Sequence, residues 1–270
     1  MGVRLGLALA AATVVLATPA GYVQSHQVAG GGFAEPGQRA TPGLTAWAVL
    51  GLAASGEDVG AAHDYLVAHE GDLEAATDVE LAVLAESVTG GASPALVARL
   101  RAFVRPTGAI GSALNSTFWG VLAFRQAGIP VPPATAGFIV RRQTRSGGWP
   151  WLTGAGPDSN DTAAAIQALR ALGVRGRPIE RGLVYLRARQ RRDGGFELNP
   201  GRGSDSPSTA WAIQAFVAAG RKPPAAAFRY LARMRRSDGS YRYSARYVSN
   251  PVWVTSQVLA ATARKPFPLP

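Results

Sequence analysis

The sequence predicts an all-α protein, a ring of about six helical hairpins in which each hairpin supplies one inner and one outer helix. Three observations lead to this prediction. A short motif returns at intervals of 45 to 47 residues, each copy is followed by a block with helical spacing of apolar residues, and most blocks end in a glycine. An α6/α6 toroid, the alpha-alpha toroid, combines all three.

The repeated motif joins glycines to a large apolar residue. The segment Gln143 to Trp149, QTRSGGW, superposes on Gln190 to Phe196, QRRDGGF, and Asp238 to Tyr241 follows in the same register. Gly31 to Phe33 and Gly108 to Ile110 occupy the corresponding place earlier in the chain. Because such an interval accommodates two short helices and their connections, each copy predicts one hairpin.

A second shared block follows each motif and carries the helical signal. In the fifth copy Ala210, Ile213 and Phe216 recur at the spacing of one helix face. Four blocks share a threonine and a closing glycine suited to the left-handed position after a helix; these are Thr45 to Gly56, Thr117 to Gly128, Thr162 to Gly173 and Thr209 to Gly220. In the sixth copy we align Gln257 with Gln214. The second copy, near residues 77–90, matches poorly.

The two helices of each hairpin differ in character, which predicts their places. The helix of the shared block is almost entirely small and apolar, whereas segments such as Ile179 to Arg191 and Pro224 to Arg236 pair an apolar stripe with an arginine-rich face. We therefore expect the first kind inside and the second kind outside. The sequence shows no polar capping repeat of the kind that open arrays need, so closure into a ring is favoured.

The first twenty residues have the pattern of an export signal. Met1 to Arg4 carries one positive charge, an uncharged apolar run from Leu5 to Ala17 follows, and Thr18-Pro19-Ala20 ends it. This run is shorter than the roughly 20 residues that span a membrane. We expect a signal peptide at 1–20, cleaved after Ala17 or Ala20, and a single toroid domain at 21–270 with no transmembrane helix. The mature protein is expected to be secreted or extracytoplasmic, in the cell envelope.

The charge is unevenly distributed along the chain. Residues 1–90 hold 10 acidic and 2 basic residues, whereas residues 91–270 hold 7 acidic and 26 basic ones. Many of the arginines fall near predicted helix ends, where they complement the helix dipole. No nucleic-acid-binding motif accompanies them, so an anionic envelope surface is the more natural partner than nucleic acid.

The repeats resemble a known family. The segments Gln143 to Trp149 and Gln190 to Phe196 look like the glutamine-to-tryptophan repeat of squalene and hopene cyclases, within the prenyltransferase and terpene-cyclase toroids. In that family the glutamine ties one hairpin to the next helix while the aromatic residue packs beneath it, so the resemblance implies a structural role for these repeats. It extends over about six hairpins, most of the mature chain.

A second resemblance concerns catalysis. The segment Asp158-Ser159-Asn160-Asp161-Thr162-Ala163 resembles the Asp-x-Asp-Asp-Thr-Ala signature of class II terpene cyclases, whose middle aspartate protonates the isoprenoid. Asn160 stands at that position, and a carboxamide is not a useful proton donor. Asp161, with Asp158 beside it, is the candidate catalytic residue if burial raises its pKa. As acids at a helix start, both are also ordinary capping residues.

Other activities of related rings are disfavoured. Zinc prenyltransferases need a cysteine ligand and thioester proteins a reactive cysteine, whereas this sequence has none, so we expect no metal and no cofactor. The three histidines, His26, His63 and His69, lie in the N-terminal third. A single ring is also smaller than the paired rings usual in class II cyclases, which counts against an enzyme.

The favoured hypothesis is an exported, non-catalytic binder of an apolar, isoprenoid-like ligand, held near the starts of the inner helices. Candidate ligand-binding residues are Asn160, Trp47, Trp119, Trp151, Trp211, Tyr243 and Trp253. The tryptophans at helical spacing equally fit an ordinary core. A class II terpene cyclase-like enzyme, a protein-binding or structural module, a cobalamin carrier and a glycoside-processing enzyme using Asp158, Asp161, Glu197 or Asp205 are the alternatives.

Overall fold

The structure, a computed structural model, describes residues 17–270 and confirms the all-α toroid. The inner helices are α2 (Pro42–Ala54), α4 (Ala76–Thr89), α6 (Leu114–Gln126), α8 (Ser159–Ala171), α10 (Ser206–Ala218) and α12 (Pro251–Thr262). The outer helices are α1 (Pro19–Gln24), α3 (His63–Ala68), α5 (Pro94–Ala102), α7 (Ala134–Arg141), α9 (Arg177–Arg187) and α11 (Ala225–Met234). Two short 3-10 helices, Gly60–Ala62 and Glu70–Asp72, flank α3. A two-residue hairpin, β1 (Phe196–Glu197) with β2 (Ser204–Asp205), precedes α10.

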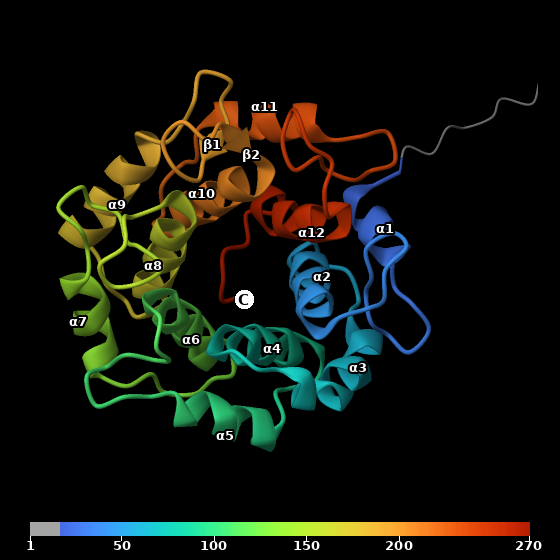
Figure 1. Cartoon of the computed structure of the whole chain (residues 1–270), viewed down its shortest axis with the longest axis horizontal. Helices are drawn as coiled ribbons and strands as arrows, with labels where there is room; N and C mark the ends of the chain where they lie inside the picture. Colours follow the sequence, from blue (N-terminus) through green and yellow to red (C-terminus); the bar gives the residue numbers. More distant parts are fainter. Residues whose placement is uncertain (1–16) are drawn as a thin grey trace, which may run out of the picture.

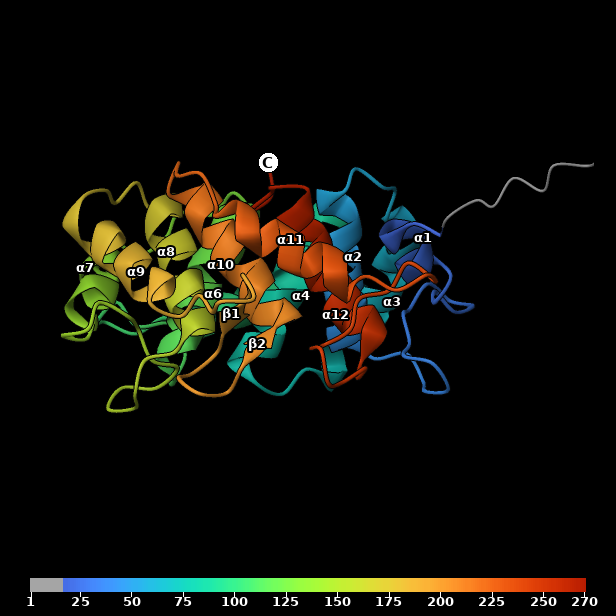
Figure 2. The same ribbon diagram turned by 90° about the horizontal axis from the view of Figure 1, so that it is seen from above.

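The helices form two concentric rings (Figure 1). Each inner helix packs against the next, and α12 packs against α2, so the inner ring is closed. Seen from the side, the molecule is a disc one helix thick, with the C-terminus on one face and the β hairpin towards the other (Figure 2). The predicted inner and outer places are confirmed.

Burial explains why the two kinds of helix take these places. Eleven of the thirteen residues of α10 are buried, because the helix is surrounded by protein on nearly all sides. In α9 the buried residues, among them Ile179, Leu183 and Leu186, lie on one face and the arginines on the other. An amphipathic helix of this kind buries its apolar stripe only when it lies at the edge of the ring.

The shared threonines join each motif to its inner helix. In five hairpins the Oγ1 atom of the threonine accepts the backbone N–H of the large motif residue, at 2.9–3.1 Å. The pairs are Phe33 with Thr45, Ile110 with Thr117, Trp149 with Thr162, Phe196 with Thr209 and Tyr241 with Thr255. The recurring threonine is therefore a structural clasp. No such bond is present in the second hairpin, α3 with α4, whose sequence match is poor.

The glutamine and the aromatic residue of the motif are also structural. The Nε2 atom of Gln143 donates to the carbonyl oxygens of Gly147 and Pro178, at 2.7 and 2.8 Å, and so ties the loop to α9. Trp149 is fully buried, and its Nε1 atom donates to the carbonyl of Ile139 on α7 at 2.8 Å. The expected packing between hairpins is confirmed.

The predicted register of the sixth copy is wrong. Thr255 takes the place of Thr209 in the clasp, so Gln257, two residues further on, corresponds to Trp211 rather than to Gln214. The side chains of Trp211 and Gln257 meet, with Nε1 of Trp211 donating to Oε1 of Gln257 at 2.8 Å. The shared glutamine was misleading because it lies five positions after the threonine in α10 but two positions after it in α12.

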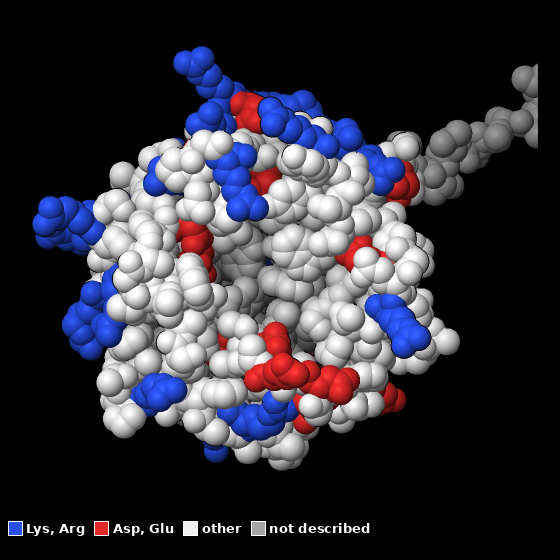
Figure 3. Space-filling view, in the orientation of Figure 1, with Lys and Arg blue, Asp and Glu red and all other residues white. Residues whose placement is uncertain are grey.

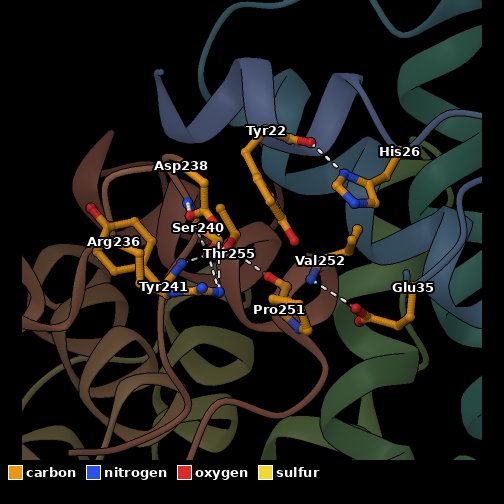
Figure 4. A network of polar contacts seen from close by, with 10 residues as sticks. All are labelled: Tyr22, His26, Glu35, Arg236, Asp238, Ser240, Tyr241, Pro251, Val252 and Thr255. Atoms are coloured by element: carbon orange, nitrogen blue, oxygen red, sulfur yellow. Dashed lines mark hydrogen bonds and ion pairs between the residues drawn. The ribbon is translucent and has the colours of Figure 1, made fainter. Parts of the chain in front are cut away.

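The ring closes at a seam between the first and sixth hairpins (Figure 4). Glu35, in the loop before α2, accepts the backbone N–H groups of Val252 and Trp253 at 3.0 and 2.9 Å and so caps α12. Further along the seam a methyl group on Gly51 of α2 would collide with the backbone of Ser256 of α12. Close backbone packing and a non-local cap hold the two ends of the repeat together.

We expect Glu35→Ala to lower the free energy of unfolding by about 1 to 2 kcal/mol, because two helix-terminal N–H groups lose a charged acceptor. Urea denaturation followed by circular dichroism measures the change. The control is Glu74→Ala at an exposed position, which should shift the unfolding free energy by less than about 0.5 kcal/mol. Equal effects of the two substitutions would show that the cap does not hold the seam.

The signal-peptide prediction falls mostly on residues 1–16, outside the described residues. Thr18 caps α1 by accepting the N–H of Gly21 at 3.0 Å, and Ala20 is buried. Of the two cleavage positions considered, the one after Ala17 therefore leaves α1 whole. Within residues 17–270, the helices are all too short or too polar to cross a bilayer.

Candidate functional site at the amino mouth of the ring

The inner helices α2, α4 and α12 begin around a hollow of about 380 Å³, at the end of the ring that we call the amino mouth. Its apolar lining includes Leu44, Trp47, Leu81 and Trp253, and Glu35, Arg39 and Asp78 stand among its polar residues. A volume of this size is within the range of small-molecule sites. About half of the lining residues are polar or charged, so the hollow combines an apolar wall with a polar rim.

Three of the predicted tryptophans meet inside the ring. The rings of Trp47 and Trp119 are 5.5 Å apart, those of Trp47 and Trp211 6.0 Å, and those of Trp119 and Trp211 5.2 Å, all edge to face. They come from α2, α6 and α10, alternate helices of the inner ring. We call them the tryptophan cluster. Trp47 and Trp119 are partly exposed, whereas Trp211 is buried, so the cluster serves both as core and as wall.

The remaining predicted ligand-binding residues lie elsewhere around the ring. Trp253 shares the hollow with Trp47. Trp151 is 51% exposed on the loop before α8, whose backbone bonds the start of α6 at Asn115. Tyr243 lines a separate polar groove with Arg202 and Arg246 on the rim. The structure thus brings four of the six aromatic residues together and leaves Trp151 and Tyr243 apart.

The segment with the cyclase-like signature begins α8. Asp158 is the cap of this helix, and its Oδ1 atom accepts the N–H of Asp161 at 2.9 Å. Asn160 and Asp161 are both partly exposed in the first turn. Asp158 therefore has the capping role that the sequence predicts. Asn160 and Asp161 are the polar side chains of this turn that remain as candidates for ligand binding or catalysis.

Burial raises the pKa of Asp161 far above its ordinary value, and the neighbouring Asp158 carboxyl raises it further. A carboxylic acid in these surroundings keeps its proton at neutral pH, since the ionised form is poorly solvated and repelled by the adjacent carboxylate. Asp161 therefore has the property that a proton donor requires, although the family position for that donor holds Asn160.

Sequence reasoning missed Glu80, a fully buried carboxyl on α4. Its Oε1 atom accepts a hydrogen bond from Ser116 of α6 at 2.7 Å, while Oε2 has no partner. Burial raises its pKa well above the ordinary value. The available signal was a glutamate inside a block of apolar residues, but the poor repeat match in the second hairpin concealed which face it occupies.

The carboxyls considered for glycoside processing have structural roles. Glu197 pairs with Arg191 at 3.5 Å and accepts the N–H of Gly201. Asp205 caps α10 and accepts from both the backbone and the hydroxyl of Ser208, at 2.7 and 2.9 Å. Burial raises the pKa of Asp205 to about 6. Because both carboxyls hold loops and helix ends, the structure offers little support for that alternative.

Metal-ligating side chains do not gather in the described residues, where no group of three or more His, Cys, Asp or Glu is close enough to hold an ion. His63 bonds Thr89, while His26 and His69 bond the carbonyl oxygens of Tyr22 and Tyr65. Each histidine thus has a local partner within its own part of the fold.

Basic and acidic side chains gather on different parts of the surface (Figure 3). Lysine and arginine gather along the outer edge near α7, α9 and α11, and acidic side chains lie close to a central hollow. Arginines occupy the last turns of α5, α6, α7, α8, α9 and α11. The dipole explanation of the basic residues is therefore confirmed at these helices.

Sequence comparison finds no family model and no curated protein that matches this chain. Comparison with solved structures is informative. The type II terpene cyclase MstE from Scytonema superposes with a TM-score of 0.71 at 15% identity, over 91% of this chain and 95% of that one. A protein from Actinoplanes superposes with a TM-score of 0.68 at 17% identity, over 91% of this chain and 97% of that one. A glycosidase superposes with a TM-score of 0.63 at 13% identity, over 91% of this chain and 94% of that one.

These similarities correct one argument from the sequence. A single ring does not count against an enzyme, since the matching type II terpene cyclase is itself covered almost entirely by one ring. The glycosidase shows that the same ring serves unrelated chemistry, as is common for folds of this kind. At these identities the comparisons establish the fold alone, and this chain has a terpene-cyclase-like toroid fold.

Proposed function

We propose that the protein binds an isoprenoid-like ligand at the amino mouth, with the tryptophan cluster as the apolar wall of the site. The observation that carries this proposal is that Trp47 lines the hollow together with Trp253 and Leu81. Trp119 and Trp211 pack edge to face against Trp47 and extend the apolar wall behind it. Aromatic faces and edges at this density suit a branched, unsaturated hydrocarbon chain.

The absence of a carboxyl at the family position favours binding over catalysis. Asn160 keeps the shape of an aspartate and one acceptor oxygen, but its amide donates no proton to an alkene. A solved structure of an Asp-to-Asn variant of MstE holds the substrate geranylgeranyl dihydroxybenzoate. For that enzyme a carboxamide is therefore compatible with binding, and we extend this to Asn160 as part of the proposal.

Titration with geranylgeraniol tests the proposal. We expect saturable quenching of tryptophan fluorescence and a rise in the melting temperature, because a ligand that binds only the folded chain stabilises it. Trp47→Ala should weaken binding at least about tenfold, the effect of losing roughly 1.4 kcal/mol of contact. The matched control Trp151→Ala, at the exposed position, should bind normally. Absence of binding across isoprenoid alcohols, acids and diphosphates would remove the proposal.

A second candidate function, isoprenoid cyclisation started by a proton from Asp161, rests on the raised pKa of that carboxyl. It predicts slow turnover of a polyprenyl substrate to cyclic products, detected by gas chromatography and mass spectrometry. Asp161→Asn should then abolish turnover while binding persists, and Asp161→Glu should restore part of it. Turnover that survives Asp161→Asn would exclude this carboxyl as the acid.

We further propose that the protein is exported to the cell envelope and that its basic outer edge lies against an anionic surface there. The motif at residues 1–20 and the arginines of α9 and α11 support this. Mass spectrometry of the N-terminus after expression in a secreting host should show cleavage after Ala17. An uncleaved chain retained in the cytoplasm would refute export.

A further inference from the structure

The end of the chain turns back into the ring. After α12, residues 264–270 run to the centre of the ring, with Phe267 at 3% and Leu269 at 8% exposure, while Pro268 is half-buried and Pro270 is exposed. Burial of every second residue is the pattern of an extended segment bound along a groove. Figure 1 shows this segment reaching the centre of the ring, and Figure 2 places its end on the face opposite the β hairpin.

Two inner-helix glutamines hold the backbone of this segment. Oε1 of Gln167, on α8, accepts the N–H of Phe267 at 2.8 Å. Gln126, on α6, accepts the N–H of Leu269 at 2.6 Å and donates Nε2 to its carbonyl oxygen at 3.3 Å. A side-chain amide that pairs with both backbone groups of one residue, as Gln126 does with Leu269, recognises an extended chain, and the single contact of Gln167 with Phe267 fixes its register.

The buried side chain of this segment reaches the tryptophan cluster from the opposite side. The ring of Phe267 lies 6.1 Å from Trp211 and 6.5 Å from Trp47. Leu269 borders a hollow of about 640 Å³ at the carboxyl mouth, where the inner helices end. Trp47 therefore lines the hollow of the amino mouth and also contacts Phe267. The same side chain borders both the proposed ligand site and the place that the segment occupies.

The bore also contains polar side chains that the segment leaves unpaired. Gln214 of α10 is fully buried with neither side-chain atom bonded, and Nε2 of Gln257 of α12 has no partner. A buried polar group without a hydrogen-bond partner destabilises the folded chain. If the segment leaves, both amide atoms of Gln126 and the Oε1 atom of Gln167 lose their partners in the segment too. A molecule that replaces the segment therefore needs hydrogen-bonding groups as well as an apolar body.

We propose that the segment Pro266 to Pro270 is an internal occupant of the ring, which competes with an apolar molecule bearing an oxygen-containing end group for the space beside Trp47 and Trp211. This proposal rests on the ligand site proposed at the amino mouth and adds that the segment must leave before the ligand binds fully. The complete site forms only when the segment withdraws, and the measured affinity is reduced by the fraction of molecules in which it is seated.

Phe267→Ser tests this competition, because it removes the apolar anchor and leaves both glutamine contacts to the backbone. Geranylgeraniol should bind the variant about tenfold more tightly than the unsubstituted protein. Nile red, an apolar dye of different shape, should also bind the variant more tightly. Phe103→Ala, at a half-buried position on the outer ring, is the control for general loosening and should change neither affinity.

Leu269→Ala is the second variant and should act in the same direction if Phe267→Ser folds poorly. Equal affinity of the variants and the unsubstituted protein for both probes overturns the competition but leaves the isoprenoid site. Tighter binding of Nile red with no binding of geranylgeraniol supports the competition and removes the isoprenoid function. Failure of both probes to bind any form removes both proposals, and equal tightening in Phe103→Ala also overturns the competition.

Discussion

Replacing Trp211 by alanine is expected to lower the free energy of unfolding by about 3 to 5 kcal/mol, as is typical of a buried tryptophan. Its indole contacts Trp47, Trp119 and Phe267, so the substitution opens a cavity in the middle of the ring. It also removes the hydrogen bond to Gln257, whose buried amide would then have no partner at either atom. Urea denaturation followed by circular dichroism measures the loss.

Trp151→Ala is the matched control, because it removes the same side chain from an exposed position. Its effect on the unfolding free energy should stay within about 0.5 kcal/mol. A small effect of Trp211→Ala would mean that the bore is filled by water rather than by the tryptophan cluster, and the proposed wall of the ligand site would be wrong.

Acidification from pH 8 to pH 5 is expected to stabilise the protein by about 2 to 4 kcal/mol. Burial raises the pKa of Glu86 to about 7 and that of Asp205 to about 6, and it raises the pKa of Glu80 and Asp161 further. An acid whose pKa is higher in the folded state binds protons more readily there than in the unfolded chain. Stability therefore rises as the pH falls from these raised values towards the ordinary ones near 4.

Glu80→Gln isolates one of these contributions. The amide keeps the acceptor for Ser116 and has no charge to bury, so the variant should be more stable than the unsubstituted protein at pH 8 and show a flatter pH dependence. The expected difference is at least about 1.4 kcal/mol, the equivalent of one pKa unit. Glu74→Gln, at an exposed position, should leave the pH profile unchanged. Identical profiles for all three proteins would show that Glu80 titrates normally.

The repeat made the architecture predictable from sequence. A motif at constant spacing identifies equivalent positions, so the buried places of Trp149 and Phe196 and the inner position of each threonine-containing helix followed from alignment alone. The same alignment placed the tryptophans on inner helices. Their convergence needed the structure, because only the radius of the ring decides whether side chains from α2, α6 and α10 reach one another.

Features outside the repeat could not be predicted. Arg264-Lys265-Pro266 repeats Arg221-Lys222-Pro223, but no other hairpin has a counterpart of residues 267–270. The place of these last residues depends on Gln126 and Gln167 lying on neighbouring inner helices. The poor match in the second hairpin likewise concealed Glu80. At the candidate site, the family pattern identified Asn160 and Asp161, but the raised pKa of Asp161 depends on burial at the ring mouth, which the local sequence does not specify.

The most direct test of the central claim, an apolar ligand site in the ring, is native mass spectrometry of the purified protein after exposure to a polyprenyl alcohol mixture, followed by organic extraction. We predict a one-to-one complex with an isoprenoid, and its loss in Trp47→Ala but not in Trp151→Ala. Recovery of the unliganded protein alone, folded and with the same mass in every mixture, would contradict the claim and favour a structural role for the ring.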